Sequence, residues 1–144
     1  MSADVVEPLL RSVKDFARRH VHALDIDGAH RIPPEVLRGL AELGLFGVTL
    51  PEEFGGAGLT ALDATRLVAT LAEADRSVAT TVGLHLGLGT RGLVAWGSQA
   101  QKERWLPSLS SGEVIAAFAT TEPNSGSDLS ALECTARGDA TGAL

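Results

Sequence analysis

Through about the first 112 residues, apolar side chains recur at steps of three and four, the spacing that places them on one face of an α-helix. The clearest stretch runs from Asp4 to about Ala23, and its charged side chains lie mostly on the opposite face. The apolar positions of this stretch are Val5, Val6, Leu9, Leu10, Val13, Phe16, Ala17 and Val21. The sequence therefore predicts that most of the chain is α-helical.

Proline and glycine divide this helical part into segments. Pro34 suits the first position of a second helix, because the missing amide hydrogen needs no partner there, and Gly44 suits the position after its end. Residues 24–33 are predicted to form a polar connection, and residues 45–59 a glycine-rich loop.

Residues that can cap a helix N-terminus mark where the later helices begin. Thr60 is followed three residues on by Asp63, and Ser98 by Gln101, which is the pattern of a capping box. Ser77 is a third candidate cap. We therefore expect helices to begin at these three hydroxyl residues.

The pattern changes after Gly112. Residues 114–121 form an apolar run without a helical period, which is typical of a buried strand. A polar turn is predicted over residues 122–128, and a second strand around residues 133–137. We expect a mainly α chain that ends in the first strands of an incomplete β-domain.

This expectation divides the chain into an all-helical domain, residues 1–112, and the beginning of a β-domain, residues 113–144. A β-fragment of this length cannot close a sheet by itself. The predicted strand over residues 114–120 would therefore leave an apolar edge that favours aggregation or needs a partner.

Composition excludes several classes of function. The 12 Lys and Arg against 18 Asp and Glu give a net charge of −6, whereas binding a nucleic-acid backbone needs a basic surface. Cys134 is the one cysteine, so an internal disulfide and a metal site with several thiolate ligands are both excluded. The N-terminus is acidic, and residues 77–90, the longest uncharged stretch, are too few to span a bilayer. We expect a cytoplasmic protein with no nucleic-acid partner, no metal and no membrane span.

The segment from Gly87 to Gly92 matches G-x-G-x-x-G, the fingerprint of dinucleotide binding. That motif functions between a strand and a helix, so an NAD site would require residues 78–82 to be a strand. Close packing of helices explains Gly83, Gly87 and Gly92 equally well, and we favour it. His85 lies in an apolar segment and is expected to be a hydrogen-bonded residue of the core or a pocket wall, not a catalytic base.

The segment Phe118–Asp128 is the most specific feature. It is a predicted strand that ends in two hydroxyl residues, followed by a glycine-containing turn rich in hydroxyl groups and backbone amides. Such a turn can hydrogen-bond a phosphate or the edge of a heterocycle. An ordinary Pro/Asn/Ser/Gly turn is the alternative.

Three blocks, in this order, make the chain similar to the N-terminal part of the acyl-CoA dehydrogenases, which are FAD-dependent flavoenzymes. Together they cover the chain nearly end to end. The blocks are Leu43–Val48 leading into Pro51–Leu59, then Gln101–Pro107 with Leu109 and Ser111-Gly112-Glu113, and last Thr121-Glu122-Pro123 closing on Gly126-Ser127-Asp128.

The resemblance implies an all-helical N-terminal domain followed by a middle β-domain, with the segment Phe118–Ser127 lying against the flavin. It implies that Thr121 hydrogen-bonds the isoalloxazine ring, and that Ser127 reaches both the FAD pyrophosphate and the bound acyl-CoA. It also places Leu88 in the wall of the acyl-chain pocket. The residues implied to bind the cofactor are Phe118, Ala119, Thr120, Thr121 and Ser127.

In the family, a glutamate removes the α-proton of the acyl-CoA while the β-hydride passes to the flavin. That glutamate belongs to a C-terminal helical domain with no counterpart here, and Glu122 matches a turn residue instead. We therefore expect a fragment of an acyl-CoA dehydrogenase that has no catalytic residue of its own and is inactive alone. The alternative is a non-catalytic helical module that binds acyl-CoA or a protein and is completed by a separate chain. Homo-oligomer formation is left open, because assembly relies largely on the C-terminal helices.

Overall fold

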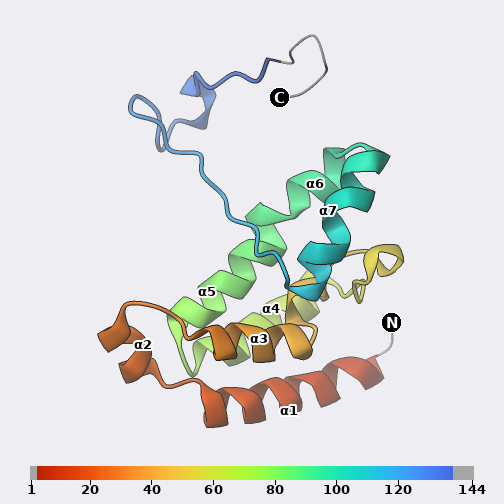
Figure 1. Cartoon of the computed structure of the whole chain (residues 1–144), viewed down its shortest axis with the longest axis vertical. Coiled ribbons are helices and arrows are strands. Elements are labelled where there is room, and N and C mark those ends of the chain that lie inside the picture. The colour runs from red at the N-terminus through yellow and green to blue at the C-terminus, as the bar shows by residue number, and fades with distance from the viewer. Residues whose placement is uncertain (1–2, 138–144) are drawn as a thin grey trace.

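The computed structural model describes residues 3–137, with side chains from Val6 onward. The side chain of Val5 and residues 138–144, the last part of the predicted β-fragment, lie outside the described residues. Within the described range the chain is mainly α-helical, as predicted (Figure 1). The α-helices are α1 (Ala3–His20), α2 (Ala23–Ala29), α3 (Pro34–Glu42), α4 (Ala61–Ala72), α5 (Arg76–Leu84), α6 (Arg91–Trp96) and α7 (Gln99–Ser111). Shorter elements are the 3-10 turns η1 (Leu45–Gly47), η2 (Glu52–Phe54) and η4 (Leu129–Ala131) and the π-helical turn η3 (His85–Gly89).

Two of the three predicted helix starts are confirmed. The Thr60 hydroxyl accepts the Asp63 amide at 3.2 Å before α4. The Ser98 hydroxyl accepts the Gln101 amide before α7, and the Gln101 side chain accepts the Ser98 amide in return. The start predicted at Ser77 is wrong, because a carboxylate two residues earlier caps α5 instead. That carboxylate, on Asp75, accepts the Val78 amide at 2.8 Å.

The second predicted helix is confirmed as α3. Pro34 is its first residue, and Gly44 follows its end with a φ of +72°, a left-handed conformation that favours glycine. The prediction that residues 24–33 are only a polar connection is wrong in part. They contain most of α2, a helix of two turns too short to show an apolar period, with Ile26 as its one buried residue.

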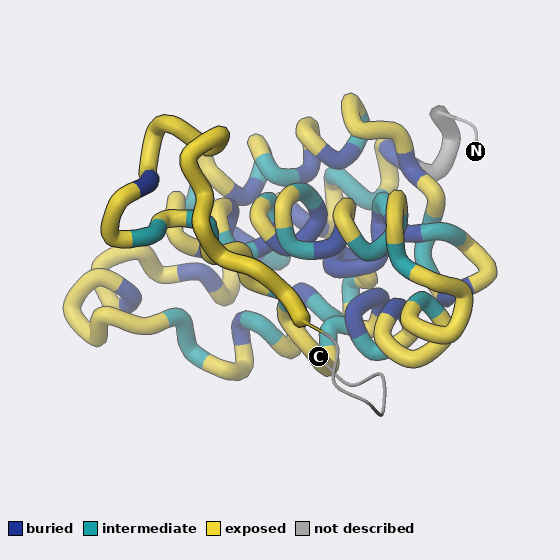
Figure 2. Tube along the Cα trace, turned by 90° about the horizontal axis from the view of Figure 1, so that it is seen from above, coloured by how far each residue is buried: buried dark blue, intermediate teal, exposed yellow. Residues whose placement is uncertain are grey.

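Three helices form the centre of the fold, with α1 packed against α4 and α4 against α5 (Figure 1). Buried residues lie along the inner sides of these helices and of α3, while the outer sides are exposed (Figure 2). Members of this core with at most 2 % of their surface exposed include Val13, Val36, Leu40, Phe46, Leu67, Leu71, Val78 and Val82. Apolar residues of α1, α3, α4 and α5 thus meet in this core.

The glycine-rich loop over residues 45–59 is ordered and largely buried. Its two ends are joined by hydrogen bonds, including that from the Leu59 amide to the Val48 carbonyl at 2.7 Å. A side chain at Gly56 would lie 2.1 Å from the Leu50 carbonyl oxygen, so only glycine allows this approach. A second apolar cluster, Leu50, Phe54, Leu106 and Leu109, attaches α7 to the loop.

Beyond Gly112 the chain runs away from the helices as an extended segment (Figure 1). The buried strand predicted over residues 114–121 is wrong for this structure, and so is the second strand around 133–137. Residues 3–137 contain a single isolated β-bridge, between Glu122 and Ser125, and no longer strand. Val114, Ile115 and Phe118 are 39 %, 36 % and 51 % exposed. An apolar run becomes a buried strand only when a second strand pairs with it, and the described residues offer none.

Candidate functional site

The extended segment is attached to the helical body at one buried histidine. The Ala116 amide donates to Nδ1 of His85 at 3.0 Å, and Nε2 of His85 lies 3.1 Å from the Phe46 carbonyl oxygen. His85 has no exposed surface, and its ring meets that of Phe46 edge to face at 5.1 Å. The prediction that His85 is a hydrogen-bonded residue of the core is confirmed.

The hydrogen-bond partners of His85 determine which of its two ring nitrogens carries a hydrogen. A carbonyl oxygen only accepts, so Nε2 carries the hydrogen toward Phe46, and Nδ1 is left to accept the Ala116 amide. This is a neutral imidazole. Burial lowers the pKa of His85 below its usual value near 6.5, against a smaller opposite effect of the carbonyls of Phe46 and Leu109.

The π-helical turn η3 lies where the segment crosses. A side chain at Gly89 would come within 2.7 Å of Cβ of Ala116, so the crossing depends on glycine there. The Thr90 hydroxyl, fully buried, donates to the Leu86 carbonyl at 3.3 Å. The NAD hypothesis is wrong, because the glycine motif follows the helix α5 and not a strand.

The helix-packing explanation of the glycines holds for one of three positions. A side chain at Gly83 would lie 3.4 Å from Val68 of α4, which is close packing. A Cβ added at Gly87 or at Gly92 would have no atom of another part of the chain within 4 Å. Packing therefore confirms the prediction for Gly83 and contradicts it for the other two.

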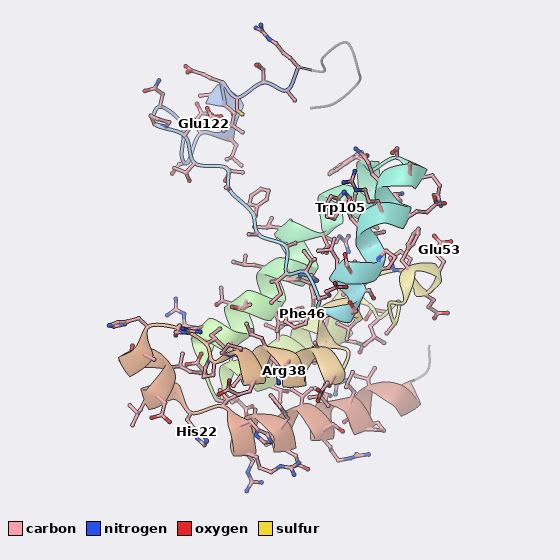
Figure 3. The ribbon with its side chains drawn as sticks, in the orientation of Figure 1. His22, Arg38, Phe46, Glu53, Trp105 and Glu122 are labelled. Atoms are coloured by element: carbon pink, nitrogen blue, oxygen red, sulfur yellow. The ribbon has the colours of Figure 1, made fainter. Side chains whose placement is uncertain are left out.

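The turn predicted over residues 122–128 is confirmed and is organised by its own side chains. Glu122 and Ser125 exchange two backbone hydrogen bonds, and the buried Ser125 hydroxyl donates to the Asp128 carbonyl at 2.6 Å. Hydrogen bonds from Ser130 lower the pKa of the exposed Asp128 carboxyl. Figure 3 shows Glu122 on this outer loop, well away from Phe46 in the helical body.

Glu122 closes the loop, and the sequence did not indicate this role. Its two carboxylate oxygens accept the amides of Glu133 and Cys134 at 2.8 and 2.9 Å. These partners lie 11 and 12 residues further on, with no spacing that a motif could reveal. Cys134 itself is exposed.

The residues expected at a flavin site lie on the extended segment and the turn that follows it. Phe118 is half exposed, Thr120 is partly buried, and Ala119, Thr121 and Ser127 are exposed. Leu88, the predicted pocket residue, is 54 % exposed on η3, one residue before the glycine that contacts Ala116. The crossing thus brings η3 and the segment to the same end of the helical body.

An open groove of about 360 Å³ lies between α4 and η3. Val68, Leu86, Gly87 and Arg91 are among the residues that line it, whereas Leu88 is not. Among residues 3–137 no group of three His, Cys, Asp or Glu side chains could hold a metal ion. No helix in that range is long and apolar enough to cross a membrane.

Comparison with known families gives a direct match. The family described as acyl-CoA dehydrogenase, N-terminal domain, matches residues 5–113, which include all seven α-helices apart from the first two residues of α1. The chain belongs to the acyl-CoA dehydrogenase family.

Individual relatives support this assignment. The chain is 40 % identical over 136 residues to the very long-chain specific acyl-CoA dehydrogenase, mitochondrial, of Macaca fascicularis, covering 92 % of this chain and 20 % of the relative. It is also 40 % identical over 129 residues to the isovaleryl-CoA dehydrogenase, mitochondrial, of Arabidopsis thaliana, covering 87 % and 32 %. The acyl groups in the names of these two relatives differ, although the chain is equally identical to both.

A solved structure extends the likeness past the helices. The acyl-CoA dehydrogenase complexed with FAD from Bacillus anthracis matches with a TM-score of 0.84 and 34 % identity, over 99 % of this chain and 24 % of that one. The matched part therefore includes the extended segment. The chain spans about a fifth to a third of the length of the relatives named here.

Proposed function

We propose that the chain supplies the N-terminal helical domain, residues 1–112, and the first flavin-facing edge, within residues 113–144, of an FAD-dependent acyl-CoA dehydrogenase. The parent reaction is the α,β-desaturation of an acyl-CoA thioester. When bound, FAD supplies the acceptor for the β-hydride. The family match carries the proposal, together with the exposure of Phe118, Ala119, Thr121 and Ser127 on a segment that leaves the helical body.

The residues present fit this cofactor. Phe118 offers an aromatic ring that is half exposed, and Thr121 and Ser127 offer exposed hydroxyls within nine residues of it. An aromatic flavin ring and a charged pyrophosphate need this combination of apolar surface and hydrogen-bonding groups. In the proposal Phe118, Ala119 and Thr120 line the flavin, the Thr121 hydroxyl hydrogen-bonds its ring, and Ser127 hydrogen-bonds the pyrophosphate. Ser127 and Leu88 also contact the acyl-CoA.

No described residue stands in for the base that removes the α-proton. Glu122 and Asp128 are the carboxylates next in sequence to the proposed flavin contacts Thr121 and Ser127. Both oxygens of Glu122 accept backbone amides, and Oδ1 of Asp128 accepts the amide and the hydroxyl of Ser130. A carboxylate held in this way positions the loop and is not directed at a substrate. We therefore propose that the 144-residue chain does not dehydrogenate acyl-CoA by itself.

A chimera tests the proposal directly. This chain would replace the matched N-terminal residues of the Bacillus anthracis acyl-CoA dehydrogenase, and the purified chimera would be assayed for bound yellow flavin and for reduction of a dye by acyl-CoA. We expect flavin retention and turnover, and a loss of turnover in the Thr121→Val variant. A chimera that has the parent's helical circular dichroism but binds no FAD would contradict the proposal.

The isolated chain gives the complementary measurement. With FAD and acyl-CoA supplied, we expect no dye reduction and no stoichiometric flavin after gel filtration, because only one edge of the site is present. Turnover by this chain alone would show that a catalytic base lies within it.

A second candidate function, a non-catalytic module that binds acyl-CoA, is favoured by the groove between α4 and η3. Thr49 lines this groove, and its hydroxyl is buried with no hydrogen-bond partner among the described residues. The volume of about 360 Å³ is in the range of small-molecule sites. Binding of acyl-CoA by the isolated chain in titration calorimetry, abolished in Ala61→Trp, would support this function. No heat of binding would exclude it.

A further inference from the structure

His85 joins three parts of the chain that are distant in sequence. Its ring lies on η3, its Nε2 contacts the Phe46 carbonyl of η1, and its Nδ1 accepts the Ala116 amide of the extended segment. The two partners are 39 and 31 residues away. Ala116 is two residues before Phe118, so the histidine holds the segment immediately before the proposed flavin contacts begin.

The packing around this point leaves the segment little freedom. The space over Gly89 is filled by Ala116, whose Cβ would lie 2.7 Å from any Cβ placed on that glycine. Gly112, with a φ of +78°, turns the chain out of α7 against the ring of Phe46, the same residue whose carbonyl His85 contacts. The Val114 amide makes a further hydrogen bond to the Ser108 carbonyl at 3.1 Å.

Only one protonation state of His85 can make both hydrogen bonds. In the neutral ring with hydrogen on Nε2, one nitrogen donates and the other accepts. A protonated ring would present an N–H at Nδ1 to the Ala116 N–H, and two donors cannot pair. The ring is enclosed, so water cannot substitute for the lost partner.

We propose that His85 is a positioning residue that anchors the flavin-facing segment to the helical domain through its Nδ1. The anchor exists in the chain as it stands and needs no cofactor. The inference rests on the proposed function only for the assignment of Phe118–Thr121 to the flavin. A failure of the anchor and a failure of flavin binding are therefore observed separately.

Two conservative substitutions separate anchoring from packing. The side-chain oxygen of Asn lies at the position of Nδ1, so His85→Asn keeps an acceptor for the Ala116 amide but does not reach Phe46. The terminal amide of Gln lies near Nε2, so His85→Gln keeps the donor to the Phe46 carbonyl and lacks an acceptor at Nδ1. If His85 only filled space, the two variants would behave alike.

The primary measurement is hydrogen exchange of the Ala116 amide in the full chain, read by NMR. We expect exchange roughly tenfold faster than wild type in His85→Gln, and within about threefold of wild type in His85→Asn, with the amides of α4 unchanged in both. Equal exchange of the Ala116 amide in the two variants, or faster exchange in His85→Asn than in His85→Gln, would overturn the proposal.

A second measurement on the wild-type chain needs no variant. The ¹⁵N shifts of the His85 ring should show a hydrogen on Nε2 and none on Nδ1 at pH 7.5. A hydrogen on Nδ1 under these conditions would also overturn the proposal.

The pH dependence of the protection of the Ala116 amide tests the role of the His85 ring directly. The groups that face it from η1 and α7 are the carbonyls of Phe46 and Leu109, and no charged side chain within residues 3–137 contributes to its pKa shift. Because burial lowers that pKa, the Ala116 amide should stay protected at pH 6.5 and lose protection only at more acidic pH. In His85→Asn this loss should be absent. A wild-type profile that matches the Asn variant would contradict the assignment.

Discussion

Substitution of Gly112 tests how the helical domain directs the chain into the extended segment. Gly112 follows α7 with a φ of +78°, and a Cβ built there would lie 2.5 Å from the ring of Phe46 and 2.8 Å from Cβ of Ala41. Gly44 is a matched control, because its φ is +72° but no atom lies within 4 Å of its Cβ position. Both changes to alanine impose the left-handed conformation, and only one adds a collision.

The difference between the two variants isolates the steric effect. A left-handed conformation costs an alanine about 1–2 kcal/mol, which is the whole expected loss for Gly44→Ala. Overpacking against a fully buried ring adds about 1–3 kcal/mol. The expected loss for Gly112→Ala is therefore about 2–5 kcal/mol, a large part of the stability of a small domain.

Urea unfolding followed by circular dichroism at 222 nm measures both free energies. With a slope of about 2 kcal/mol per molar urea, the midpoint should fall by roughly 0.5–1 M in Gly44→Ala and by roughly 1–2.5 M in Gly112→Ala. Unchanged slopes would show that the midpoints report a change in the free energy of unfolding and not in the surface exposed on unfolding. A loss in Gly112→Ala equal to or smaller than that in Gly44→Ala would refute the argument that Phe46 and Ala41 fix this turn.

Three further predictions use the same unfolding assay. Thr60→Ala should cost about 1 kcal/mol, because the amide that the hydroxyl caps loses its partner; an unchanged midpoint would mean that the cap is replaced by water at no cost. Gly92→Ala should stabilise by up to about 1 kcal/mol, because the position is in α6 and a Cβ there meets nothing; a loss would reveal an unseen contact. The free energy of unfolding should fall as the pH drops below about 6.5, because the unfolded histidine takes up a proton there that the buried His85, with its lowered pKa, does not yet bind. His85→Asn should flatten this part of the profile, and an equal slope in both proteins would assign the effect to another group.

Most structural features that depend on residues close together in sequence, such as helix caps and helix starts, could be predicted. The caps at Thr60 and Ser98 depend on a residue three positions away, and the start of α3 depends on Pro34 alone, so the sequence contains all the information needed. The cap of α5 was misplaced because Asp75 and Ser77 are both able to cap, and local pattern does not rank them.

The extended segment could not be predicted in the same way. Residues 114–121 have the composition of a buried strand, but strand formation requires hydrogen bonds to another strand, and residues 3–137 contain none that pairs with them. The amides that Glu122 accepts are likewise 11 and 12 residues away, beyond the reach of any local pattern.

By itself, then, the sequence determined the helical class, most of the helix ends and, through its ordered motifs, the family, because each of these is written in residues near one another along the chain. Tertiary structure alone decided the partners of His85, the closure of the outer loop by Glu122 and the close approach of Ala116 to Gly89. These contacts join residues brought together only when the helices pack, so no local pattern can contain them. The histidine was recognisable in the sequence as a core residue, but what it holds in place was not.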